Sequence, residues 1–216
     1  MALGGIDEAG RGPVLGPLVV AAVVTTNEAE LREWDVKDSK KIPPARRQRL
    51  ARLIQTSPDC RSVVISLSAE DVDARRERQT LNEIEVDMFK EALAALDSPE
   101  TKWFLDAADV DAARFGRLVS PTKAVTSEHG ADDCYLVVGA ASILAKTARD
   151  EAMAKLARRL ERKLPYKLGS GYPSDPNTKS FLKAYVETFG DLPEGTRRSW
   201  KTAKTLLDQN RTLDQF

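Results

Sequence analysis

The chain opens with a short apolar run that ends in two adjacent carboxylates, and this feature restricts the fold most strongly. Residues 2–7 have the pattern of a strand that ends in Asp7 and Glu8. A glycine-rich turn then leads into a second apolar run over 18–26. Adjacent acids at a strand end repel each other unless a cation that prefers hard oxygen ligands lies between them. The start of the chain therefore predicts a sheet edge with a divalent metal site beside a phosphate-bearing ligand.

The order of the remaining elements indicates an α/β fold class. Further strand-like runs cover 62–68, 102–106 and 122–126. Apolar spacing and helix-start signals predict helices over 28–34, 43–54, 82–96, 111–119, 136–164, 179–189 and 199–208. Strands come first and helices alone follow after about residue 136, which suits a sheet core with a helical C-terminal lobe.

Composition excludes several classes of protein. A chain of 216 residues is long enough to bury one good core, and no apolar run approaches the length of a membrane span. The start lacks a basic region followed by an apolar helix, so we expect no secretion signal. The two cysteines, Cys60 and Cys134, give no disulfide framework. We therefore expect a cytoplasmic protein that does not contact membranes.

The formal net charge of zero argues against indiscriminate, salt-driven binding of nucleic acid by the whole surface. Residues 146–167 are a local exception, because eight Lys and Arg residues stand there against three acids. This segment is either a basic face for a polyanion or a solvated helix face with intrahelical ion pairs.

Two more carboxylates occupy positions like those of Asp7 and Glu8. Asp106 ends the predicted strand over 102–106, and Asp132 lies in a turn just before the long helix. The carboxyl ends of adjacent strands converge on one edge of an α/β sheet, where ligands bind. Divalent ions would neutralise four acids there, and two ions about 3.5–4 Å apart would clamp a phosphodiester for hydrolysis. For any one of these acids, the alternative is a solvated or helix-capping carboxylate.

Short motifs follow one another along nearly the whole chain. The first is Gly-Ile-Asp-Glu-Ala-Gly-Arg-Gly-Pro over residues 5–13. The others lie at 36–41, 80–85, 105–106, 129–132, 140–146, 169–176 and 198–202. In this order they resemble the motifs of the ribonuclease HII family, and Gly-Ser-Gly-Tyr with Trp-Lys-Thr late in the chain is most similar to its archaeal form.

The resemblance implies a ribonuclease H-like fold, with a central mixed five-stranded sheet flanked by helices. It places the catalytic core at residues 1–165 and a helical C-terminal lobe, packed on the core, at 166–216. It also implies a monomeric, Mg²⁺- or Mn²⁺-dependent endonuclease that holds two ions. Such an enzyme hydrolyses the RNA strand of RNA/DNA hybrids and cuts 5′ of single ribonucleotides in duplex DNA, leaving a 3′-hydroxyl and a 5′-phosphate.

The same resemblance assigns the catalytic and metal-binding residues. The family's four acids match Asp7, Glu8, Asp106 and Asp132, which lie within three of these motifs. The acids beside them, Asp109, Asp111 and Asp133, are expected to be surface residues. Gly130 stands where the family more commonly has Lys, which puts some substrate or electrostatic support there in doubt.

Recognition of ribose requires a sensor of the 2′-hydroxyl, the group that distinguishes RNA from DNA. The backbone of Gly10, Arg11 and Gly12 is suited to this, because glycines permit close approach and the arginine is available for phosphate. Tyr172 matches the family tyrosine that checks the sugar from the other side. The alternative for Tyr172 is an ordinary loop aromatic packed on the surface.

Two lysines are candidates for phosphate contacts, which position a nucleic acid without reading its sequence. Lys41 follows the Asp-Ser pair of the second motif, and Lys146 lies early in the long predicted helix. The alternative for both is an ordinary surface lysine.

The last seven residues, 210–216, resemble the motif with which many archaeal homologues bind a sliding clamp. Leu213 and Phe216 fit that motif, whereas Asn210 stands in place of its Gln. The alternative is a frayed terminus.

Two other functions compete with ribonuclease HII. A related nuclease, such as ribonuclease HIII or a junction resolvase, shares the fold, although ribonuclease HIII usually has an additional N-terminal domain and this chain begins directly at the catalytic strand. A non-catalytic hybrid-binding module is disfavoured because all four acids are intact. A cleavage assay with and without Mg²⁺ separates an enzyme from a binding module.

Overall fold

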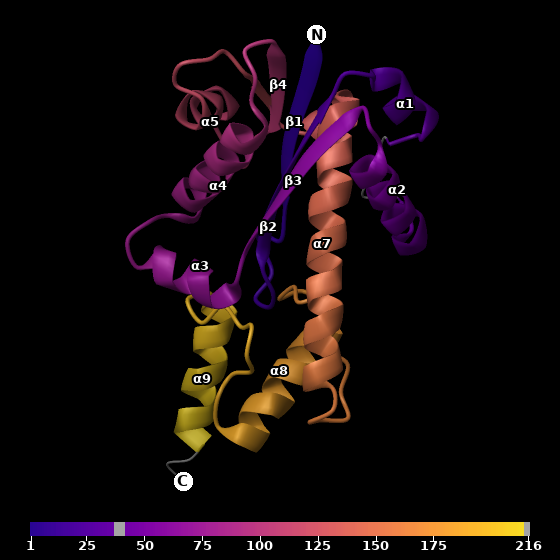
Figure 1. The fold of residues 1–216 in the computed structure, drawn as a ribbon. Coiled ribbons are helices and arrows are strands. Elements are labelled where there is room, and N and C mark those ends of the chain that lie inside the picture. The colour runs from indigo at the N-terminus through magenta and orange to yellow at the C-terminus, as the bar shows by residue number, and fades with distance from the viewer. Residues whose placement is uncertain (37–41, 214–216) are drawn as a thin grey trace. The chain divides into compact units, whose positions relative to one another are not determined.

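The computed structural model describes residues 1–36 and 42–213, and five of its strands form one mixed sheet (Figure 1). The strands are β1 (Ala2–Ala9), β2 (Leu18–Thr25), β3 (Cys60–Leu67), β4 (Thr101–Asp106) and β5 (Thr126–Glu128). Their order across the sheet is β3-β2-β1-β4-β5. The fold predicted from the sequence, a ribonuclease H-like sheet flanked by helices, is confirmed.

Strand directions bring three carboxyl ends to the same edge of the sheet. Strand β1 runs antiparallel to β2 and parallel to β4, with Ile6 opposite both Ala22 and Leu105. Strand β4 runs parallel to β5, with Asp106 opposite Glu128. The ends of β1, β4 and β5 therefore lie together.

Helices cover both faces of this sheet, and all eight residues of β2 are buried as a result. Figure 1 shows α4 (Leu81–Leu96) and α5 (Ala112–Val119) on one side, and α1 (Glu28–Glu33), α2 (Pro44–Thr56) and α7 (Leu136–Leu160) on the other. Alternate β2 residues, Val19, Ala21 and Val23, pack with α1, α2 and the first part of α7. A strand buried on both faces is apolar throughout, which explains the continuous run.

Glycine allows two close approaches to β1. A Cβ on Gly5 would lie 2.4 Å from the backbone of Val137 in α7, and one on Gly4 would lie 2.5 Å from the ring of Trp103. Neither space accommodates a side chain, so the helix backbone lies directly on the strand that carries Asp7.

The chain divides into two compact units that are each discontinuous in sequence. The first comprises residues 1–9, 19–66 and 80–148, and contains the sheet. The second comprises 10–18, 67–79 and 149–216. The division predicted from the sequence, at residues 165 and 166, remains a prediction about the domains.

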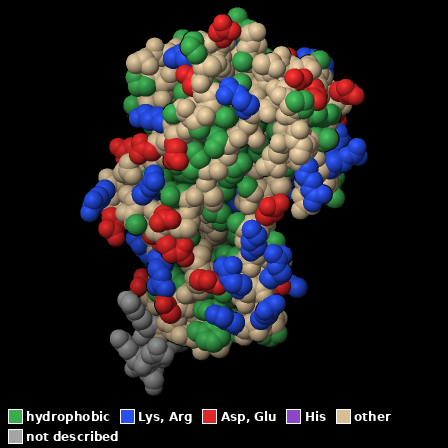
Figure 2. Space-filling view, in the orientation of Figure 1, with side chains coloured by type: hydrophobic (Ala, Val, Ile, Leu, Met, Phe, Trp, Pro, Cys, Tyr) green, Lys and Arg blue, Asp and Glu red, His purple; other side chains and the backbone are tan. Residues whose placement is uncertain are grey.

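The second unit is mainly helical. Its elements are α3 (Ala69–Arg76), the C-terminal part of α7, α8 (Pro176–Phe189) and α9 (Lys201–Leu213). Its core contains Leu15, Met153, Leu160, Phe181 and Val186. Lys and Arg side chains gather over the C-terminal part of α7 (Figure 2).

Most predicted elements are confirmed, and three of the differences have a local cause. Strand β5 covers Thr126–Glu128 instead of 122–126, because Ser120 Oγ donates a hydrogen bond to the Lys123 carbonyl (2.8 Å) and holds that segment in a turn. Helix α7 ends at Leu160, before 164, where Lys163 N–H closes a tight turn on the Leu160 carbonyl (3.0 Å).

The third difference concerns α8, which begins at Pro176, three residues earlier than predicted, because Asp175 accepts a hydrogen bond from Asn177 N–H (2.9 Å) and caps its first turn. None of the helices within residues 1–36 and 42–213 is long and apolar enough to cross a membrane.

Candidate active site

Asp7 is the centre of a carboxylate cluster in the first unit. It lies near the end of β1 and is only 4% exposed. Its Oδ1 accepts a hydrogen bond from Glu8 N–H (2.7 Å), and the Ser142 hydroxyl of α7 interacts with it as well. The close approach of α7 to β1 at Gly5 explains why a helix residue can reach this strand.

Asp106 forms a hydrogen bond with the first residue of the short helix that carries Asp132. Asp106 ends β4, and its Oδ1 accepts a hydrogen bond from the N–H of Ala131 (3.0 Å). Ala131 is the first residue of α6 (Ala131–Cys134), which carries Asp132, 2% exposed. Gly130 precedes this helix with φ +68°, a conformation that strains any residue with a side chain. The strand end therefore positions the helix that bears Asp132.

The four carboxylates form one electrostatic cluster. Burial raises the pKa of Asp7 well above its ordinary value, and the charges of Glu8 and Asp106 raise that pKa further. The charge of Asp132 acts in the same direction, whereas the hydrogen bond with Ser142 opposes it. Like charges act on a pKa in this way only when they lie near one another. The structure therefore brings together the four acids that the sequence singled out, and their catalytic and metal-binding roles remain predictions.

The donor set suits a hard divalent ion, since all four side chains offer carboxylate oxygens. Among the described residues, however, no group of three or more His, Cys, Asp or Glu side chains is arranged so as to hold a metal ion. Mutual repulsion favours separated carboxylates, and a divalent cation would reverse that preference. The residues therefore fit Mg²⁺ or Mn²⁺ by chemistry, once the side chains turn toward a common ion.

The second group of predicted site residues lies in the second unit. Gly10 has φ +94°, and a Cβ on Gly12 would lie 3.6 Å from the ring of Tyr172. The N–H of Val14 donates to the carbonyl of Gly171 (2.8 Å), which ties the two loops together. Tyr172 remains 37% exposed. The structure thus brings the Gly-Arg-Gly turn and Tyr172 side by side, with Tyr172 partly exposed to solvent.

Of the two candidate lysines, Lys146 is among the described residues. Lys146 is half-buried on α7, one helical turn after Ser142, and so lies on the helix face that reaches Asp7. Lys41 lies outside the described residues. Contact of either lysine with a phosphate remains a prediction.

Sequence reasoning missed three residues beside these groups: Ser142, Arg149 and Arg197. Ser142 falls inside one of the motifs but has no charge to draw attention. Arg149 precedes Met153, Leu156 and Leu160 at helical spacing, a signal of a buried face that was available in the sequence. Arg197 immediately precedes the last motif and carries no such signal.

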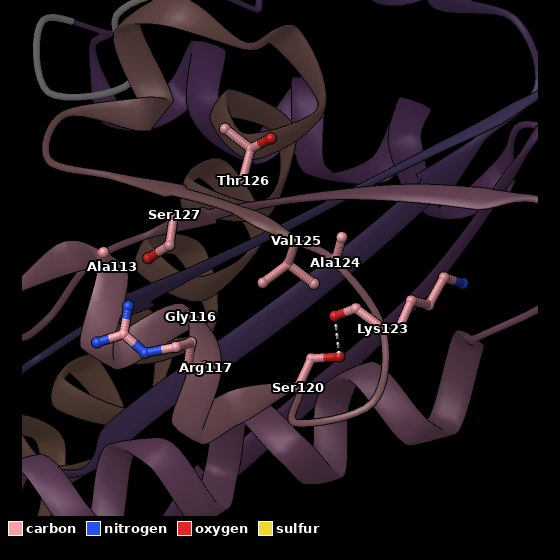
Figure 3. A pocket seen from close by; sticks show the side chains of 9 residues that line it. All are labelled: Ala113, Gly116, Arg117, Ser120, Lys123, Ala124, Val125, Thr126 and Ser127. Atoms are coloured by element: carbon pink, nitrogen blue, oxygen red, sulfur yellow. Dashed lines mark hydrogen bonds between the residues drawn. The ribbon is translucent and has the colours of Figure 1, made fainter.

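One open cavity, of about 400 Å³, lies elsewhere in the first unit (Figure 3). Residues of α5 and of the segment leading into β5 line it, and none of them was predicted as a site residue: Ala113, Gly116, Arg117, Ser120, Lys123, Ala124, Val125, Thr126 and Ser127. None of the four clustered acids therefore lines this cavity.

A mixed five-stranded sheet between helices, with clustered carboxylates where parallel strands end, defines a nuclease of the ribonuclease H-like class. The family model for ribonuclease HII matches residues 4–203. The chain belongs to the ribonuclease HII family and is a metal-dependent endoribonuclease with ribonuclease H activity.

Similar proteins support this assignment over the whole chain. A ribonuclease HII from Thermococcus onnurineus is 46% identical, covering 97% of this chain and 91% of that protein. The structure resembles ribonuclease H2 from Pyrococcus horikoshii with a TM-score of 0.85 at 39% identity, over 98% of this chain and 99% of that one. It also resembles the ribonuclease in a PCNA:RNase HII complex from Archaeoglobus fulgidus, with a TM-score of 0.84 at 39% identity, over 99% and 100% of the two chains.

Proposed function

We propose that this enzyme hydrolyses the RNA strand of RNA/DNA hybrids and also cuts duplex DNA on the 5′ side of a single ribonucleotide. The products would be a 3′-hydroxyl and a 5′-phosphate. The observation that carries this proposal is the cluster of four carboxylates around Asp7, where the parallel strands β1 and β4 end. Such a group of acids is suited to metal-assisted hydrolysis of a phosphodiester.

Asp7, Glu8, Asp106 and Asp132 are the residues that would hold two divalent ions, Mg²⁺ or Mn²⁺. When bound, the ions supply activation of the attacking water and stabilisation of the leaving oxygen. The protein contributes the fixed positions of the carboxylates: β1 and β4 are parallel neighbours in the sheet, and the Asp106–Ala131 hydrogen bond (3.0 Å) sets the helix that bears Asp132.

Recognition of the substrate falls to other residues. The backbone of Gly10, Arg11 and Gly12 would contact the ribose and its phosphates, and Tyr172 would stack on the sugar of the ribonucleotide. The proximity of Gly12 to the Tyr172 ring supports a joint role of the two loops. Lys41 and Lys146 would contact backbone phosphates, which supply affinity independent of the sugar.

A sliding clamp is the proposed protein partner. The comparison structure from Archaeoglobus fulgidus is a complex of RNase HII with PCNA. In this chain, residues 210–216 would provide the docking motif, weakened because Asn210 has a shorter amide side chain than Gln. We propose that the enzyme otherwise acts as a monomer.

The decisive experiment uses a duplex of DNA that contains one ribonucleotide. The enzyme should cut it once, 5′ of that ribonucleotide, in the presence of Mg²⁺ or Mn²⁺ and not in EDTA, and should leave an all-DNA duplex intact. Mapping of the product ends distinguishes this outcome from a cut on the 3′ side. A protein that binds the hybrid but never cuts it would be a binding module, and preferential cutting of a four-way junction would identify a resolvase.

A further inference from the structure

A fully buried arginine, Arg197, holds the Gly-Arg-Gly turn from behind. Its Nη2 donates a hydrogen bond to the carbonyl of Gly10 (2.6 Å), and its Nη1 donates to the carbonyl of Arg11 (3.1 Å). Its Nε donates to the carbonyl of Gly16 (3.1 Å), where the same loop returns. The three nitrogens of one guanidinium therefore hold both ends of the loop over residues 10–16, which contains the turn proposed to recognise the ribose.

The Arg197 guanidinium forms no ion pair with a carboxylate of the described residues. Burial and the charge of Arg149 lower the pKa of Arg197 to about 10, so the guanidinium still carries its proton at neutral pH. Its partners are the three loop carbonyls and the ring of Trp200, 4.9 Å away. A buried charge needs compensation, and here the loop dipoles supply it.

The geometry of the peptide bond gives these contacts a consequence for the substrate. In a planar trans peptide the C=O of one residue and the N–H of the next point in opposite directions. Because Arg197 holds the carbonyls of Gly10 and Arg11, the N–H groups of Arg11 and Gly12 point away from it. The Gly12 N–H donates no hydrogen bond to any described residue, and Gly12 is exposed. A guanidinium on the carbonyl side also polarises these peptides and strengthens their N–H donors.

We propose that Arg197 is a positioning residue for ribose recognition, which turns the Arg11 and Gly12 N–H groups toward the 2′-hydroxyl of the substrate. This proposal rests on the proposed function, since it explains how the Gly-Arg-Gly turn becomes a sensor of ribose. Arg197 does not itself touch the substrate. Lysine cannot replace it, because an ammonium group is a point donor that does not span three carbonyls in a fixed fork.

A second buried arginine, Arg149, contacts the neighbouring loop, and its Nη1 also lies 3.7 Å from Asp150 Oδ1. Arg149 is 2% exposed and donates from Nη2 to the carbonyl of Ser170 (2.9 Å). Its guanidinium carbon lies 5.2 Å from the centroid of the Tyr172 ring, within the range of a cation–π contact. Both loops of the proposed sensor are therefore held by internal arginines before any substrate arrives.

The test measures binding without cleavage. Ca²⁺ replaces Mg²⁺, and the dissociation constant is measured for a duplex with one ribonucleotide and for the matched all-DNA duplex. In Arg197→Lys we expect the preference for the ribonucleotide to fall by roughly three- to tenfold, the worth of one neutral hydrogen bond. Affinity for the all-DNA duplex should change by less than about twofold, because phosphate contacts carry it.

Arg198→Lys is the matched control. Arg198 is the adjacent residue, but its side chain is half-exposed and pairs with Asp191 (2.7 Å). This control should keep the full preference of the wild type. If Arg197→Lys is folded by circular dichroism and keeps that preference too, the positioning role is wrong.

A measurement on the wild type keeps the proposal testable if the variant does not fold. The amide resonances of Arg11 and Gly12 are followed by NMR while each duplex is added. Larger shifts with the ribonucleotide duplex support the proposal, and equal shifts with both duplexes overturn it. A wild-type protein that binds both duplexes equally would instead refute the proposed function, so the two failures are distinguishable.

Discussion

The carboxylate cluster of the first unit and the arginine-held loops of the second unit are opposite solutions to burying charge. Around Asp7, burial and the charges of three neighbouring carboxylates raise the pKa of one carboxyl, and the described residues supply no arrangement that holds a neutralising metal. Around Arg197, one positive group is compensated by three backbone carbonyls of its own chain. The first group fits a divalent metal by its chemistry, whereas the hydrogen bonds of the second are formed without a ligand. Groups that are fixed in advance need little reorganisation when a ligand arrives, so the arginine-held loops are suited to recognition.

The strongest test of this contrast is Asp7→Asn. Loss of one carboxylate of the proposed metal site should reduce cleavage of the single-ribonucleotide duplex by about a hundredfold or more. The metal-free variant should nevertheless unfold at a higher temperature than the wild type, because a buried charge among like charges is removed. For a chain of this size, each kcal/mol added to the free energy of unfolding raises the unfolding temperature by roughly 2–4 °C.

The pH dependence of that gain has a definite sign. The folded-state pKa of Asp7 lies above its ordinary value, so ionised Asp7 destabilises the folded protein as the pH rises through the ordinary carboxyl pKa. The advantage of Asp7→Asn should be largest near neutral pH and should vanish below about pH 4, where the carboxyl is protonated in both states. Thermal unfolding in EDTA at several pH values measures it. A variant less stable than the wild type at neutral pH would contradict this account of the cluster.

The second test removes a compensated charge instead. Arg149→Met should lower the free energy of unfolding by roughly 2–4 kcal/mol, because it leaves the carbonyl of Ser170 without its donor and removes the contact with Tyr172. Urea unfolding measures the change. Arg159→Met is the control, since Arg159 is largely exposed and pairs with Glu194, which lies in a turn; surface pairs of this kind contribute little. Equal losses of stability in Arg149→Met and Arg159→Met would show that the buried arginine contributes no more than a surface ion pair.

Tyr172→Ala tests recognition with a smaller effect. We expect cleavage at a single embedded ribonucleotide to fall by about tenfold, the worth of one lost stacking contact. Overall affinity for the duplex should change less, because phosphate contacts along the backbone remain. Single-turnover rates and dissociation constants for one duplex separate the two quantities. If both decline together, Tyr172 contributes general affinity and does not sense one sugar.

Deletion of residues 211–216 should have the smallest effect on catalysis. None of the proposed site residues lies there, so cleavage of short duplexes should proceed at the wild-type rate. Binding to the cognate sliding clamp, followed by calorimetry, should be lost. Equal clamp binding before and after the deletion would show that the tail is not a docking motif.

The sequence was sufficient to place residues whose position follows from a regular strand or from the start of a helix. Asp7 and Asp106 follow apolar strand runs, and parallel strands bring such ends together, so their proximity was predictable from topology. The start of α4 was similarly clear, because Thr80 and Glu83 form a capping box that short-range chemistry dictates.

Long-range hydrogen bonds were beyond the reach of the sequence. Arg197 appears in the sequence as one more charged residue, a type that is almost never fully buried unless paired, and the helical spacing that indicates burial of Arg149 does not show its partners. Only the folded chain reveals that backbone carbonyls serve as their partners. Strand β5 was displaced for a related reason, because a side-chain hydrogen bond at Ser120 decides where pairing begins.

The anchor of the Gly-Arg-Gly turn is separated from it by 187 positions along the chain. A ribosome therefore makes both carboxylates of β1 and the whole turn long before it makes Arg197. A chain that stops anywhere between Asp132 and Arg197 carries all four acids and lacks the residue that orders the turn. Under the proposed roles, incomplete products of translation would carry the acids for cutting without the residue that positions the turn for ribose recognition.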